Sequence, residues 1–491
     1  MPADRAEPRG RIRGVGLVTF GTLATAGLWW TGPIPGDRDW PVHYLRGYVV
    51  AWVAYVCAAW LVRNRGSARW GLAWIVAVAV ALRVVAFART PRPSTDVYRY
   101  LWDGRVVTAG INPYQYAPDA RQLAHLQDKH WREIGFKDIP TIYPPAAQLL
   151  FAGLSRVSST DPDVFRLAFA GFDVGVVLLL IALLRRTGRA PEQVIWYAWC
   201  PLAATESAAG GHVDVAGVFL LALAFLLAAR ARGRPGCGSA LALAAAVMTK
   251  GFALLAAPFF IRRGGLKFAG WFALGCVVLA APFVGAGRHL FDGLIAYLSA
   301  WKVNASLFVL ADWLLEHVTP SHYQITRLGS LVAILLVTVW LLWRQRPGIG
   351  GLIAGASLAL GAMLVLGAPT LPWYVIWTVP ALCWWSAPGW VLLTFTVAAQ
   401  YYGQWLWHGS PHALLWAGYM PVYCLLVWQA AARWGRPHVR GPMRQAPLDM
   451  PRGRQGRPAL QGGGSPSKQA EGSEQDGGAG AEGGDEGAGD L

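Results

Sequence analysis

The chain has 491 residues, of which 55% are hydrophobic and only 14% charged. Repeated apolar runs of membrane-spanning length exclude a soluble globular protein and predict an all-α polytopic integral membrane protein. The net charge of +16 does not indicate a nucleic-acid partner, because the Arg and Lys residues gather at the ends of apolar segments, as they do in cytoplasmic loops.

Three apolar segments open the chain, at about 15–31, 46–62 and 71–88. Arginines precede the first segment, and the basic turn 63–69 follows the second. The positive-inside rule then predicts a cytoplasmic N-terminus and places the polar stretch 89–145, the first loop, on the extracytoplasmic side.

Further apolar segments follow at about 144–157, 164–184, 193–209, 213–229, 239–260, 267–284, 327–343, 350–367, 373–386, 388–406 and 412–431. Basic turns alternate with polar or aromatic ones, which predicts about 12–14 membrane segments in an in/out ladder. The segment 239–260 is expected to be a broken hairpin, and 144–157 is either re-entrant or spanning.

The sequence predicts three regions. Membrane helices occupy 1–69, and the main membrane domain occupies 70–431. A second outer loop, at 285–326, has helical apolar spacing and is expected to lie along the interface. The tail 432–491 is basic and Pro-rich, then Gly-rich and acidic. It lacks the apolar content to fold, so we expect a disordered cytoplasmic appendage.

The first loop mixes acids, bases and aromatic residues, and such long loops are usually functional. Asp96 lies just beyond the outer end of a helix, where an ionised carboxylate could act as a general base on a sugar hydroxyl. Alternatively, Asp96 caps a helix that begins at Val97. Seven residues later, Asp103 falls nearly on the same helical face. Arg99 and Arg105 bracket it, either as surface ion pairs or as phosphate ligands.

Glu206, His212 and Asp214 flank a Gly turn between two apolar segments on the same predicted side as the first loop. Charges at membrane depth usually mark function, although a solvated polar turn would look the same. His212 and two carboxylates could suit a metal, but their spacing matches no dedicated zinc motif. We therefore expect no metal or other cofactor.

Lys250 lies in the middle of an apolar run, beside the helix-breaking Gly251. It is either a phosphate ligand or a snorkelling residue at a hairpin tip. Trp373 and Tyr374 begin a later apolar segment, where aromatic residues can serve as an interfacial belt or stack on a sugar.

Several motifs together resemble a known family. The loop sequence from Asp96 to Arg105, the stretches 110–114 and 142–145, and the later groups 211–214, 249–250, 301–304 and 372–374 are similar to those of bacterial polyprenol-phosphate-mannose-dependent mannosyltransferases of the glycosyltransferase C superfamily. The chain departs from the common pattern at Val213 and Leu371.

The resemblance implies a multi-pass transferase of the bacterial inner membrane, with both termini cytoplasmic and the first loop extracytoplasmic. It would move a sugar, in this interpretation mannose, from a polyprenyl-phosphate donor to a glycan or lipid acceptor with inversion. Asp96 would be the general base, and Asp103 is a second catalytic candidate. The candidate donor-phosphate ligands are Arg99, Arg105, His212, Lys250 and Arg288. The candidate sugar or acceptor contacts are Tyr98, Tyr143, Glu206, Asp214, Trp301, Asn304, Trp373 and Tyr374.

Two other classes fit parts of this pattern. A transporter or flippase of lipid-linked sugars would also use ionisable residues and broken helices, but it predicts charge pairs near the bilayer midplane. A polysaccharide ligase or polymerase would use the same carrier lipids with a different set of site residues.

Overall fold

The computed structural model describes residues 7–32, 39–63, 71–90, 94–403 and 411–434. Helices make up most of these residues, which contain no β-strand apart from an isolated bridge between Val303 and Pro369. This confirms the predicted all-α class. The predicted disordered tail lies outside the described residues from position 435 onward.

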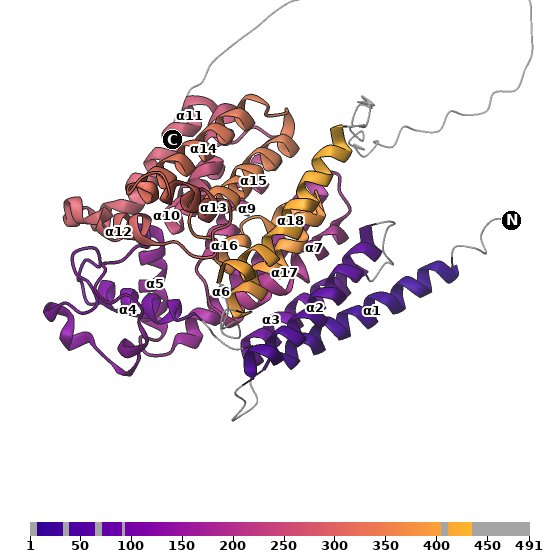
Figure 1. Cartoon of the computed structure of the whole chain (residues 1–491), viewed down its shortest axis with the longest axis horizontal. Coiled ribbons are helices and arrows are strands. Elements are labelled where there is room, and N and C mark those ends of the chain that lie inside the picture. The colour runs from indigo at the N-terminus through magenta and orange to yellow at the C-terminus, as the bar shows by residue number, and fades with distance from the viewer. Residues whose placement is uncertain (1–6, 33–38, 64–70, 91–93, 404–410, 435–491) are drawn as a thin grey trace, which may run out of the picture. The chain divides into compact units, whose positions relative to one another are not determined.

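Three long helices open the chain: α1 (Glu7–Trp30), α2 (Trp40–Arg63) and α3 (Gly71–Arg89). They pack side by side (Figure 1). The hydroxyl of Tyr48 on α2 donates to the carbonyl of Thr394 at 2.9 Å, which ties this group to the C-terminal part of the membrane domain.

The first loop contains short helices, as predicted. They are α4 (Asp96–Thr108), η1 (Arg121–Leu126) and η2 (Lys129–Glu133), and α5 (Pro145–Val157) follows the loop. Pro144 caps α5 and Pro145 occupies its first turn, where a missing N–H costs nothing. The segment that α5 occupies has only 13 residues, too few to cross a bilayer as a helix.

The rest of the described chain is a succession of long and short helices: α6 (Pro162–Arg186), η3 (Pro191–Val194), α7 (Ile195–Ala198), α8 (Pro201–Ala204), η4 (Thr205–Ala209), α9 (Asp214–Arg230), α10 (Cys237–Thr249), η5 (Gly251–Ala256), α11 (Ala257–Ala280), η6 (Ala281–Phe291), α12 (Asp292–Ala300), α13 (Leu307–Glu316), α14 (His322–Trp343), α15 (Gly348–Leu366), α16 (Pro372–Val375), η7 (Val379–Cys383), α17 (Pro388–Gly403) and α18 (Pro411–Trp434). By length and composition, 6 of the described helical stretches can cross a membrane.

Two predicted continuous segments are broken, which corrects the sequence-based boundaries. The stretch 193–209 is divided into η3, α7, α8 and the π-helical turn η4, and 373–386 into α16 and η7. Proline explains the breaks, because it removes a backbone donor and clashes with the preceding turn: Pro201 begins α8 and Pro380 lies in η7. The predicted break inside 239–260 is confirmed, since α10 ends at Thr249.

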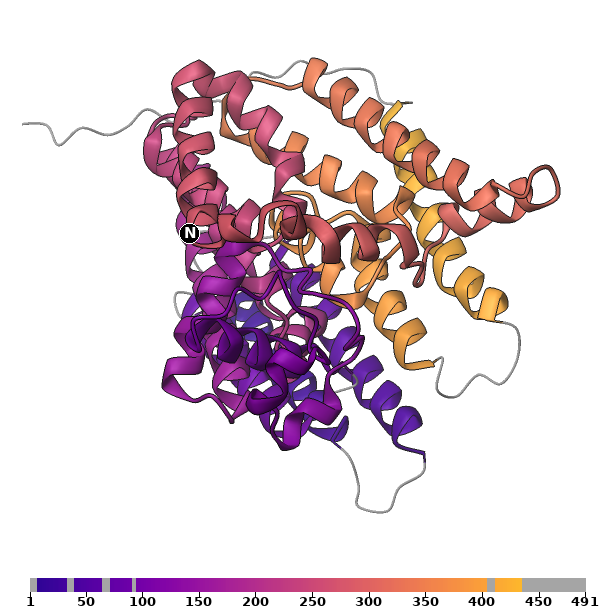
Figure 2. The ribbon, with the colours of Figure 1, turned by 90° about the vertical axis from the view of Figure 1, so that its left-hand side faces the viewer.

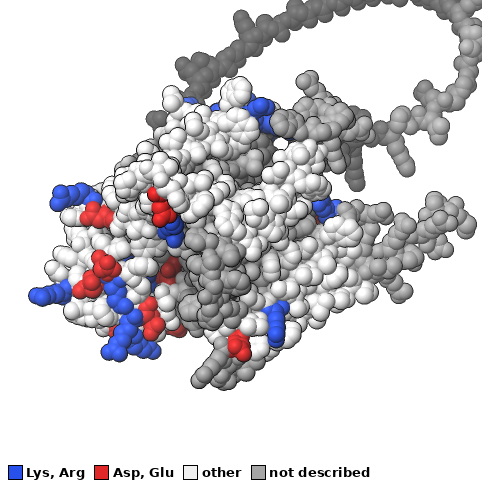
Figure 3. Space-filling view, in the orientation of Figure 1, with Lys and Arg blue, Asp and Glu red and all other residues white. Residues whose placement is uncertain are grey.

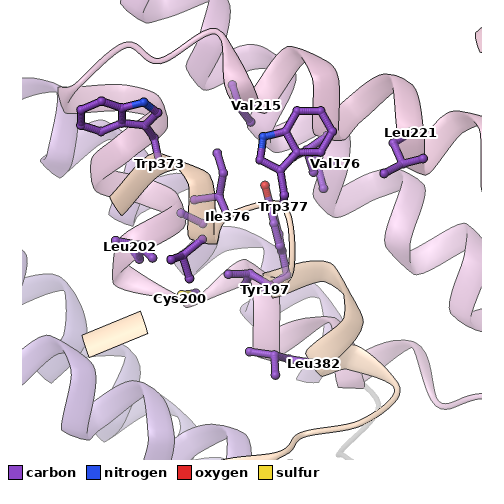
Figure 4. Close-up of a cluster of buried hydrophobic side chains, with 14 of the residues drawn as sticks. Val176, Tyr197, Cys200, Leu202, Val215, Leu221, Trp373, Ile376, Trp377 and Leu382 are labelled. Atoms are coloured by element: carbon purple, nitrogen blue, oxygen red, sulfur yellow. The ribbon is translucent and has the colours of Figure 1, made fainter. Parts of the chain in front are cut away.

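Residues of the broken segments are buried in the hydrophobic core of the described domain. Trp373, Ile376 and Trp377 pack into a buried cluster that Figure 4 shows, together with Val176, Tyr197, Cys200, Leu202, Val215, Leu221 and Leu382. Gly217 on α9 permits this packing, because a Cβ there would lie 2.5 Å from the ring of Trp377. Short helices that end in this core can present polar side chains away from it.

The described surface divides by charge. On the face shown in Figure 3, Lys, Arg, Asp and Glu gather mainly over the side where Figure 1 shows α4 and α12, and most of the remaining described surface is uncharged. An uncharged, apolar surface on the long helices is what contact with lipid requires. The first loop and the second loop thus share the charged side.

Candidate active site

A cavity of about 300 Å³ lies between the first loop, the second loop and the breaks in the membrane helices. It brings together seven of the residues singled out in the sequence: Asp96, Arg99, Tyr143, Lys250, Trp301, Trp373 and Tyr374. These residues come from four separate parts of the chain. Figure 2 shows the two loops beside each other, and the side-chain amide of Gln115 donates across to the carbonyl of Gly285 at 3.1 Å.

Asp96 is the first residue of α4 and is partly exposed in the cavity. Thr95, and not Asp96, is the N-cap, and it makes no side-chain capping bond. The hydroxyl of Tyr143 donates to Asp96 Oδ2 at 3.4 Å. Burial raises the pKa of the Asp96 carboxyl, while nearby Lys250 acts to lower it. Burial and Asp96 raise the pKa of Tyr143 in turn, so its hydroxyl stays protonated and is the donor.

Lys250 lies in the break between α10 and η5, where the chain is extended. Its Nζ is 3.2 Å from Asp214 Oδ2, and the indole of Trp377 donates to Asp214 Oδ1 at 2.9 Å. The ammonium also lies 5.1 Å from the ring centre of Tyr374 and 5.3 Å from that of Tyr143. The carboxylate pairs with this ammonium, and the ring faces stabilise it further. Asp214, fully buried behind it, therefore holds Lys250 toward the cavity.

Arg99 and Asp103 of α4 bind the last residues of the first loop. Arg99 Nε donates to Asp103 Oδ1 at 2.9 Å, and its Nη2 donates to the carbonyl of Ile139 at 3.0 Å. Asp103 Oδ2 accepts from Gln148 at 3.1 Å and from the hydroxyl of Thr141. Asp103 is buried in this network and does not line the cavity. Its contacts position the loop, and a direct catalytic role for it stays a prediction.

Other predicted residues lie outside the cavity lining. Arg105 donates to Asp128 at 2.6 Å and to the carbonyl of Leu126, so it anchors the loop. Tyr98 stacks on His130 with ring centres 5.3 Å apart. Arg288 is exposed on η6. Asn304, with φ of 51°, donates to the carbonyl of Thr370. Their predicted substrate contacts stay untested.

Glu206 and His212 form a buried pair behind the cavity. Glu206 Oε2 is 3.7 Å from His212 Nε2, and the His212 ring centre is 3.8 Å from that of Trp373. Neither ring nitrogen of His212 has a hydrogen-bond partner among the described residues. His212 of this pair packs against Trp373, neither residue lines the cavity, and a substrate role for either residue stays a prediction.

The cavity also contains residues that were not among the predicted site residues, such as Phe136, Ile142, Tyr297 and Leu371. The hydroxyl of Tyr297 bonds that of Tyr374 at 2.5 Å. Tyr297 lies in an apolar helical stretch and Phe136 in a mixed loop, so neither has a local pattern that marks it. Only the approach of the two loops brings them to Asp96.

Comparison with known proteins gives two family matches. Residues 13–263 match the model described as alpha-(1->6)-mannopyranosyltransferase, N-terminal domain, and residues 303–406 match the MptB C-terminal domain. A probable alpha-(1->6)-mannopyranosyltransferase of Mycolicibacterium smegmatis is 24% identical over 395 residues, which are 67% of this chain and 69% of that protein. The first match begins at residue 13 and so includes most of α1 and all of α2, which precede the stretch that carried the resemblance. These matches lend no support to a transporter.

Proposed function

Because the chain belongs to the alpha-(1->6)-mannopyranosyltransferase family, it is a membrane glycosyltransferase, and we propose that it transfers mannose from a polyprenyl-phosphate donor to a hydroxyl of a glycan or lipid acceptor. The observation that carries this proposal is the meeting of Asp96, Lys250 and several aromatic side chains in one cavity. A base, a cation for a phosphate and ring faces for a sugar are the groups that such a transfer needs.

The proposed step is an inverting displacement. The acceptor oxygen attacks the anomeric carbon as Asp96 takes the hydroxyl proton, and the bond from that carbon to the phosphate oxygen breaks with its electrons leaving on the phosphate. An alpha-linked product then requires a beta-linked donor. Of the five proposed phosphate ligands, Arg99 and Lys250 line the cavity, and they are the ones that we assign to the developing charge.

The donor assignment follows from the surroundings of the cavity. The described chain offers no Gly-rich cradle for a nucleotide phosphate, whereas uncharged helices adjoin the charged side of the molecule. A lipid-linked donor can place its chain along such a surface and its phosphate beside Lys250. We further propose that the enzyme lies in the bacterial inner membrane, with this cavity on the extracytoplasmic side.

The test uses purified protein in liposomes, radiolabelled polyprenyl-phosphate mannose and a synthetic mannoside acceptor. Asp96→Asn should lower kcat by roughly 100- to 10,000-fold, because the amide cannot accept the proton. Asp119→Asn is the matched control, since Asp119 is an exposed carboxylate of the same loop that does not line the cavity.

Both variants should insert into the membrane as the natural chain does and unfold at the same temperature. Turnover by Asp96→Asn within a few fold of the control would remove Asp96 as the base. Transfer from a nucleotide-linked mannose, and not from the lipid phosphate, would overturn the donor assignment.

A further inference from the structure

Phe136 occupies an unusual position at the edge of the cavity. Its side chain is 62% exposed although it is apolar, and its φ of 51° lies in the left-handed region. A bulky residue pays a conformational cost there, and such outliers persist where the surrounding structure enforces them. Charged residues at 132, 133, 137 and 138 flank it. This segment therefore faces water and not the lipid.

The loop around Phe136 is firmly held. Asp119 N–H donates to the carbonyl of Lys137 at 3.2 Å, and Lys137 Nζ donates to the carbonyl of Arg132 at 2.9 Å. On the other side, Arg99 binds the carbonyl of Ile139. The exposed ring is thus presented by a braced turn and not by a loose one.

The ring of Phe136 reaches across to the second loop. Its centre is 4.4 Å from that of the Trp301 ring, and the planes of the two rings make an angle of 61°. Trp301 is held in turn, because Arg327 donates to its carbonyl at 2.8 Å and its ring lies 5.2 Å from that of Tyr297. Tyr297 bonds Tyr374, whose ring lies against the Lys250 ammonium. A continuous aromatic wall therefore leads from the exposed edge to the charged interior.

We propose that Phe136 and Trp301 form a subsite for the sugar units that precede the reacting one in a glycan acceptor. The inference rests on the proposed function. With the reacting sugar at Asp96, the preceding units of a saccharide would extend toward the exposed edge, where two rings at a steep angle offer faces for the C–H side of a sugar. A braced, partly exposed aromatic pair suits this role because it loses little conformational freedom on binding.

The test compares two synthetic acceptors with the same alkyl group, one bearing a single mannose and the other three. In the natural chain, the trisaccharide should have the lower KM. Phe136→Ala should raise the KM for the trisaccharide roughly 3- to 10-fold and leave that for the monosaccharide unchanged, because one ring face is lost. Phe136→Trp keeps a ring and should stay near the natural value.

Phe291→Ala is the matched control, because Phe291 is 54% exposed and does not line the cavity. It should change neither KM. An equal change for both acceptors in Phe136→Ala, no change for either, or a change confined to the donor KM would overturn the subsite.

Equilibrium binding of the trisaccharide alone separates this inference from the proposed function. If the natural chain transfers nothing from the lipid-phosphate donor, the proposed function fails. Weaker trisaccharide binding by Phe136→Ala than by Phe291→Ala still supports the subsite, and equal binding by the two variants rejects it.

Discussion

At the scale of single residues, the environment of Asp96 decides its chemistry. Burial raises the pKa of its carboxyl above the 3.8 of an ordinary aspartate, whereas Lys250 and the Tyr143 hydrogen bond act in the opposite direction. A base works best when its pKa approaches the working pH. A partly buried carboxylate with a raised pKa is therefore a better proton acceptor than an exposed one.

This environment predicts a pH dependence. The carboxylate is the active form, so kcat/KM should fall as the pH drops through the pKa of Asp96, and this limb should lie above pH 3.8. Tyr143→Phe removes a hydrogen bond that stabilises the carboxylate. The pKa of Asp96 should then rise further, and the acid limb should move to higher pH.

A pH–rate profile of both forms in liposomes measures this shift, whatever the loss in absolute rate. Asp119→Asn is the control, because Asp119 is exposed and does not line the cavity. Its acid limb should lie at the same pH as in the natural chain. A limb in Tyr143→Phe at the same pH as in the natural chain, or at a lower one, would show that Asp96 does not set it.

Part of the cavity could be predicted at this scale, since Asp96 lies in a long polar loop between apolar segments, Trp373 begins an apolar run and Lys250 interrupts one. A charge in such a place is costly, and that cost makes it conspicuous in a sequence. Arg105 was a candidate from the same polar loop as Asp96, and it serves as a loop anchor. Whether a charge meets a substrate or a neighbouring carbonyl depends on tertiary contacts that spacing does not contain.

At the scale of elements, the packing of α4 on α5 positions Asp96. Gly104 makes it possible, because a Cβ at this position would collide with the carbonyl of Phe151 and the hydroxyl of Ser155. Backbone cannot move aside as a flexible side chain can. The close approach also brings Gln148 on α5 to Asp103 on α4.

Gly104→Ala should therefore destabilise the protein by about 1–3 kcal/mol through overpacking. Thermal unfolding in detergent measures the change. Gly153→Ala on the facing helix α5 is the control, since a Cβ there meets nothing within 4 Å, and alanine favours a helix. The packing argument fails if Gly104→Ala unfolds at the temperature of Gly153→Ala or above it.

Element boundaries were less predictable than element class. Apolar composition predicts that a stretch is buried, but it does not distinguish a continuous helix from several short ones. The prolines at 191, 201, 372 and 380 carried that information for the broken segments. They matter because each break frees polar backbone and lets residues such as Trp373 turn toward the cavity.

At the scale of the whole described domain, the two ends of α9 differ in their polar surroundings. Asp214 and the nearby cavity lie at its start, and the basic turn Arg230–Arg234 follows its end. A helix of 17 residues is about 26 Å long, close to the hydrocarbon thickness of roughly 30 Å. Gly233 of this turn lies against Gly348 and Ile349, and Arg263 of α11 donates to the carbonyl of Arg346, so other basic residues lie near the same end. The positive-inside rule then predicts that the cavity faces away from the cytoplasm.

Cysteine labelling in intact bacterial cells tests this orientation. The native Cys237 is exposed at the start of α10, just after the basic turn. In a chain whose other native cysteines are replaced, a membrane-impermeant maleimide should label Asp119→Cys in the first loop from outside. It should reach Cys237 only after the membrane is permeabilised. The reverse pattern would put the cavity on the cytoplasmic side, where the proposed extracytoplasmic acceptor could not reach Asp96.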